Sequence, residues 1–116
     1  MFRKILLTFS LICQLAFSSE VISQVSDTTL ANFYIHRSTD FVLVNNDSVF
    51  YYGEKALSLS RDINYKKGEA ASLLNVGAVI FDAGNQSLGL QYILKAKHIY
   101  EEIGNEDGIL ASYLSL

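Results

Sequence analysis

The chain contains no proline, although average usage would place roughly six in a protein of this length. Long uninterrupted helices are therefore permitted, and proline-rich turns and linkers are excluded. The single cysteine, Cys13, excludes an intramolecular disulfide. A formal net charge of −3 lacks the basic excess of a nucleic-acid-binding surface. The 116 residues suffice for one domain, and half of them are hydrophobic, so we expect a packed core.

Residues suited to catalysis or metal binding are few. The two histidines, His36 and His98, have no cysteine or carboxylate at metal-ligand spacing, and Glu101 and Glu102 favour a solvated helix face around His98. No Ser–His–Asp, Cys–His or paired-carboxylate arrangement is present. We therefore expect no catalytic site, metal, cofactor or small-molecule substrate, and predict that the chain is not an enzyme.

The first residues follow the order of a secretory signal peptide. A short basic start, Met1–Lys4, precedes an apolar run from Ile5 to Phe17, and small or polar residues come next. Cleavage fits after Ser18 or after Ser23, and the second site is favoured because it removes the whole apolar stretch. We predict a signal peptide over 1–23 and export to the periplasm or the medium. The alternatives are an uncleaved anchor that tethers the protein to the membrane, or an ordinary buried helix.

The chain repeats itself at an offset of 40 residues, from 52–76 to 92–116, without a gap. The matching pairs are Tyr52 with Tyr92, Lys55-Ala56 with Lys95-Ala96, Ile63 with Ile103, Gly68 with Gly108, Ala71-Ser72 with Ala111-Ser112, and Leu74 with Leu114. Such periods are typical of solenoids, in which helix pairs stack on one another. We therefore predict an all-α solenoid of antiparallel helix pairs over 24–116, with units at about 27–64, 67–104 and a partial one at 107–116.

Apolar residues recur at helical spacing inside each unit. First-type helices are predicted from Asp27 or Thr28 to Val44, from Gly68 to Ala83, and from Gly108 onward; second-type helices are predicted over 48–63 and 88–103. Gly84 and Gly104 are expected to end helices, because glycine adopts a positive φ readily. Ser87 and Asp107 are predicted to cap the helices that follow them.

The motif Leu-x-x-Val-Gly-x-x-Ile-Phe-x-x-Gly at 73–84, with Lys95-Ala96 after it, resembles a tetratricopeptide repeat. The 40-residue period is similar to the long-unit variety of exported or membrane-anchored bacterial regulators. The family's closing proline is absent. The resemblance implies that small residues such as Gly77 and Ala96 let helices approach closely. The residues expected to pack the repeats together are Tyr52, Ala56, Gly77, Ile80, Tyr92 and Ala96.

The resemblance also implies a concave groove, lined by the first-type helices, that binds a protein or peptide. The candidate groove residues are Leu74, Asn75, Ala78, Phe81, Asp82 and Leu114. Only Asn75 matches the carboxylate-clamp members of the family, so an apolar ligand such as a helix fits better. The alternative interpretation is that Leu74 and Phe81 pack between repeats. An aromatic group, Phe50, Tyr51, Tyr52 and Tyr92, is interpreted as inter-helix core rather than as a stacking platform.

Leu116 lies in the middle of a predicted first-type helix, so we expect a fragment of a longer protein. The alternative is self-association, in which another copy covers Leu110, Tyr113, Leu114 and Leu116. Two classes of function fit this organisation. One is a non-catalytic interaction scaffold. The other is the exported sensory part of a membrane signalling protein, such as a histidine kinase or a transcriptional regulator, truncated at Leu116.

Overall fold

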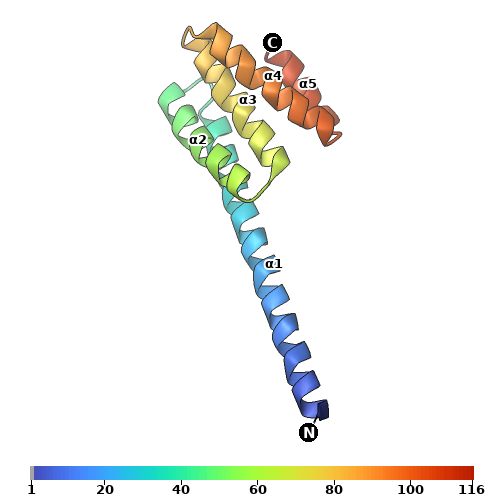
Figure 1. Cartoon of the computed structure of the whole chain (residues 1–116). Helices are drawn as coiled ribbons and strands as arrows, with labels where there is room; N and C mark the ends of the chain where they lie inside the picture. Colours follow the sequence, from blue (N-terminus) through green and yellow to red (C-terminus); the bar gives the residue numbers. More distant parts are fainter. Residues whose placement is uncertain (1) are drawn as a thin grey trace.

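The computed structural model describes residues 2–116 (Figure 1). The side chains that it leaves undescribed in this range are those of Phe2, Arg3, Ile5, Leu6, Leu7, Phe9, Phe17 and Gln24. The described chain forms five α-helices and no strand: α1 (Phe2–Asp40), α2 (Asn46–Asp62), α3 (Lys66–Asp82), α4 (Gln86–Glu102) and α5 (Glu106–Leu114). The all-helical prediction is confirmed.

Helix α1 begins earlier than the predicted first-type helix, and it ends at Asp40 instead of Val44. It begins at Phe2 instead of Asp27 or Thr28, because no glycine or proline interrupts 2–40. The hydroxyls of Ser18 and Thr29 donate to the carbonyls of Gln14 and Val25, which keeps these polar side chains within the helix. No backbone break marks residue 23, and cleavage there stays a prediction.

The first half of α1 extends away from the other four helices (Figure 1). Its apolar side chains Leu11, Ile12 and Leu15 are more than half exposed. A search of the described residues finds no helix that is both long enough and apolar enough to cross a membrane.

Asparagine side chains, and not the predicted Ser87 and Asp107, cap two of the later helices. The Oδ1 atom of Asn85 accepts a hydrogen bond from the Leu88 backbone N–H at 3.2 Å, and Asn105 accepts one from Gly108 at 2.8 Å. Both predictions placed the helix start too late in the chain, because α4 already begins at Gln86 and α5 at Glu106. Gly84 and Gly104 follow the ends of α3 and α4 with φ angles of 101° and 67°, as predicted.

Each helix packs against the next one in the chain, and α3 contacts all four others. Figure 1 shows α3 between α2 and α4. No Cα atom of α2 lies within 8 Å of a Cα atom of α4. Helix α1 contacts α3, and α3 contacts α5. Helices α2 and α4 thus both pack against α3 without a close approach of their own backbones.

Helices α3 and α4 cross closely at two glycines. A Cβ atom added to Gly89 would lie 2.7 Å from the carbonyl oxygen of Gly77 and 2.6 Å from the backbone nitrogen of Phe81. Backbone atoms cannot rotate aside as a side chain can, so only glycine fits at this position.

The core lies beside this crossing and joins three helices. It consists of Leu57 from α2, Ala70 and Leu73 from α3, and Ala96, Ile99 and Tyr100 from α4. Burial raises the pKa of Tyr100 above its ordinary value, because the phenolate form is poorly solvated there. Ile109 of α5 packs against the same cluster. The core therefore links α2, α3 and α4 to the last helix, α5.

Two fully buried serines differ in their hydrogen bonding. The Ser38 hydroxyl donates to the Val49 carbonyl at 3.0 Å and so links α1 to α2. The Ser60 hydroxyl has no hydrogen-bond partner among the described residues. A buried hydroxyl without a partner costs free energy, since it has lost its hydrogen bonds to water.

The capping assignment predicts unequal effects of two neighbouring substitutions. Asn85→Ala should lower the free energy of unfolding by about 1 kcal/mol, because it leaves the Leu88 N–H without a partner. Ser87→Ala should change it by less than about 0.5 kcal/mol. Chemical denaturation followed by circular dichroism measures both, and a larger loss for Ser87→Ala would contradict the assignment.

Alanine substitutions of the buried Ser60 and Ser38 should change the free energy of unfolding in opposite directions. Ser60→Ala should raise the free energy of unfolding by about 1 kcal/mol, because it removes an unpartnered buried hydroxyl. Ser38→Ala should lower it by about the same amount, because it removes the buried hydrogen bond from the Ser38 hydroxyl to the Val49 carbonyl. The same denaturation experiment tests the pair, and a destabilised Ser60→Ala variant would show that this hydroxyl has a partner.

Candidate binding surfaces

The predicted groove residues on α3 are largely engaged within the fold. Leu74 packs against the core cluster. The Asn75 side-chain amide donates to the Thr39 hydroxyl at 3.0 Å and so ties α3 to α1. Ala78 and Phe81 are half-buried. This face therefore holds helices together.

The other two groove candidates, Asp82 and Leu114, are exposed. They lie on different helices, at the end of α3 and at the end of α5. The structure thus does not gather the six candidates into one depression.

A large hollow lies elsewhere, between α2 and α4 over the C-terminal half of α3. We call it the α2–α4 hollow. Its cavity volume is about 910 Å³, which is within the range of ligand-binding pockets. The residues that line it are Asn46, Asp47, Phe50, Tyr51, Glu54, Lys55, Val79, Ile80, Ala83, Asn85, Leu88 and Tyr92.

The walls of the α2–α4 hollow are mainly apolar and aromatic. Phe50 and Tyr51 are 45% and 54% exposed, so these rings are open to solvent. Leu88 and Tyr92 lie opposite them on α4, and Ile80 belongs to α3. Large apolar side chains that stay accessible in a concave site are typical of a surface that binds another molecule.

The interpretation of the aromatic group as inter-helix core holds only in part. Tyr52 is half-buried and its ring stacks on Phe41, at a centroid distance of 5.9 Å. Phe50 and Tyr51 are exposed, and for them the interpretation is wrong. Their neighbour α4 lies too far away to cover them, since it contacts α3 and not α2.

The residues predicted to pack the repeats together divide between core and hollow. Ala56 and Ala96 have no exposed surface, and Gly77 is buried at the helix crossing. Ile80 and Tyr92 are half-buried and line the α2–α4 hollow. Sequence reasoning missed the exposure of Phe50. This residue directly follows the buried Val49 and falls outside the series of buried positions in α2, which are Val49, Gly53, Ala56, Leu57 and Ser60.

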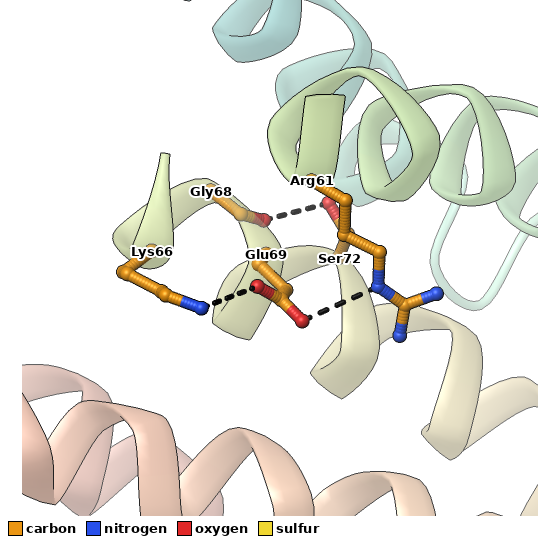
Figure 2. A network of polar contacts seen from close by, with 5 residues as sticks. All are labelled: Arg61, Lys66, Gly68, Glu69 and Ser72. Atoms are coloured by element: carbon orange, nitrogen blue, oxygen red, sulfur yellow. Dashed lines mark hydrogen bonds and ion pairs between the residues drawn. The ribbon is translucent and has the colours of Figure 1, made fainter. Parts of the chain in front are cut away.

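A polar network at the junction of α2 and α3 is centred on Glu69 (Figure 2). The carboxylate of Glu69, which is 11% exposed, accepts from Arg61 Nε at 3.2 Å and pairs with Lys66 Nζ at 3.4 Å. Two cationic partners stabilise a carboxylate that is shielded from water. The network therefore joins the two helices.

His98 lies on a solvated helix face. Its Nε2 atom is 3.1 Å from a carboxylate oxygen of Glu102, and both side chains are mostly exposed. Glu101 pairs with Lys97 at 2.7 Å. No three histidine, cysteine, aspartate or glutamate side chains in the described part of the chain lie together as a metal site would need.

The chain matches no protein-family model, no curated protein and no solved structure. Its own geometry must therefore supply the basis for any function assigned to it.

The packed face of α3 and the exposed end of α5 predict different responses to a matched pair of substitutions. Leu74→Ala should lower the free energy of unfolding by about 1–2 kcal/mol, because Leu74 packs on the core. Leu114→Ala, at the equivalent position of the next unit, should change it by less than about 0.5 kcal/mol. Denaturation of the two variants measures the difference, and equal losses would show that Leu114 is also packed.

Proposed function

We propose that the chain is a non-catalytic scaffold that binds a protein or peptide, and that the α2–α4 hollow is its binding surface. The observation that carries this proposal is the hollow itself, about 910 Å³ in volume, with accessible aromatic walls between two helices whose Cα atoms stay more than 8 Å apart. A concave apolar surface offers burial to a partner's side chains. Binding is therefore the function that this geometry supports best.

We also infer a solenoid of the tetratricopeptide type. The contacts of α3 with α1 and α5, and the separation of α2 from α4, support stacked helix pairs. Local contacts repeat at the sequence offset: Ser72 donates to the Gly68 carbonyl, and Ser112 donates to the Gly108 carbonyl, both at 2.8 Å. An array of this kind presents extended surfaces that suit protein partners.

Export of the chain is part of the proposal and is supported by the order of basic, apolar and small residues in 1–23. Self-association is supported by α5, where Leu110, Tyr113 and Leu114 are 59%, 56% and 81% exposed. An apolar helix face of this kind is suited to packing against another helix.

The proposal predicts that the full chain selects helical peptides from a random library of about 16-residue segments, which span some four helical turns. Enriched peptides should compete with one another for one site. Phe50→Asp and Leu88→Asp should weaken their binding by at least about tenfold, because each places a charge in an apolar wall. Fluorescence anisotropy with labelled peptides measures the affinities.

Leu114→Asp serves as the control, because it places the same charge on an exposed apolar residue outside the hollow. Circular dichroism of each variant verifies that it folds. The proposal is wrong if the library yields no binder, or if the enriched peptides lose affinity for Leu114→Asp and keep it for Phe50→Asp.

A further inference from the structure

The charges around the α2–α4 hollow are unbalanced. Asp47 and Glu54 of α2 bring two carboxylates to its lining, and Lys55 is the one cationic side chain there. Neither carboxylate has an ion-pair or hydrogen-bond partner among the residues that the structure describes. Glu54 is also half-buried, so its charge is partly removed from water. A half-buried carboxylate without a partner favours the approach of a cation.

Lys55 does not neutralise these carboxylates. Its ammonium nitrogen lies 4.7 Å from the centre of the Tyr51 ring and 5.5 Å from that of Tyr34, on α1. A hydrogen bond to Tyr51 raises the pKa of Lys55 above its ordinary value, with smaller contributions from Tyr34 and Tyr52. The lysine is therefore engaged with tyrosines, and Glu54 stays open to an outside partner.

The walls of the hollow determine what backbone conformation a bound peptide can have. Both walls and the floor are α-helices, whose interior backbone N–H and C=O groups are bonded within their own helix. Along the helix interiors an extended peptide would find few backbone partners and would leave most of its own polar groups unpaired. A helical peptide satisfies its backbone internally and needs only side-chain contacts, as in other helix-in-groove complexes.

We propose that the α2–α4 hollow binds a basic amphipathic helix, with an apolar face against Phe50, Ile80 and Leu88 and with separate lysine or arginine side chains that reach Glu54 and Asp47. The aromatic rings favour the same partner, since cations are attracted to the faces of tyrosine and phenylalanine. The formal charge of −3 on the chain also favours the approach of a positive molecule. This inference rests on the proposed scaffold function and specifies the partner for that site.

Two designed peptides of about 16 residues test the inference, with apolar residues spaced three and four apart along one face in both. One carries lysine and arginine beside this face, and the other carries glutamate. The basic peptide should bind the full chain about tenfold more tightly than the acidic one, and higher salt should narrow the gap. Fluorescence anisotropy at low and high salt gives both affinities.

Variants at Glu54 locate the charge effect. Glu54→Gln should weaken the binding of the basic peptide about threefold, because it removes one partly exposed ion pair. The binding of the acidic peptide should not weaken. Glu54→Lys should reverse the preference between the two peptides. Glu106→Gln removes a carboxylate on α5, outside the hollow, and should leave the preference unchanged.

The outcomes separate this inference from the scaffold proposal. If both peptides bind equally and Phe50→Asp abolishes the binding of both, the hollow binds helices without selecting their charge. In that case only the inference of a basic partner is wrong. If neither peptide binds and library selection also fails, the scaffold proposal fails with it. If sedimentation shows that the full chain dimerises and Phe50→Asp dissociates it, a second copy fills the hollow and the basic partner is overturned.

Discussion

The arrangement of the helices depends on how closely α3 is approached from two sides. Gly89 of α4 meets Gly77 of α3 without room for a Cβ atom, and Gly53 of α2 lies against the side chain of Val76 on α3. Both neighbours sit tightly on α3, and no Cα atom of one lies within 8 Å of a Cα atom of the other. The α2–α4 hollow is the consequence of this separation, and its residues face solvent because no helix spans the gap.

The α2–α3 and α4–α5 junctions each place a tyrosine ring against a glycine, with exchanged residues. Gly68 and Gly108 lie 40 residues apart, and the ring is that of Tyr65 at the first junction and that of Tyr100 at the second. Where Tyr65 supplies the ring, it stands at the N-cap of α3 and its side chain accepts no cap hydrogen bond, and the small Ser60 fills the place of Tyr100. Where Tyr100 supplies it, the N-cap is free for Asn105. The exchange explains both an uncapped helix and a buried hydroxyl without a partner.

Sequence patterns predicted the helices well, because apolar spacing and the positive φ of Gly84 are local properties. They failed on the caps, where Asn85 competes with Ser87 and only the true helix start decides which side chain reaches a free N–H. They also failed on the binding surface. An apolar residue such as Phe50 looks the same in sequence whether a neighbouring helix covers it or leaves it exposed. Its exposure depends on the distance between helices, which is set by the contacts of α3 with residues 53 and 89.

The surfaces left apolar by this arrangement differ in the chemistry that they offer. The exposed face of α5 presents Leu110 and Leu114, so it is suited to another apolar helix face. The α2–α4 hollow combines aromatic rings with the unpaired carboxylate of Glu54, which adds selectivity for charge to the burial of apolar surface. Because Glu54 and the rings of Phe50 and Tyr51 all belong to α2, this one helix supplies most of the contacts in the proposed recognition, while α4 closes the opposite wall.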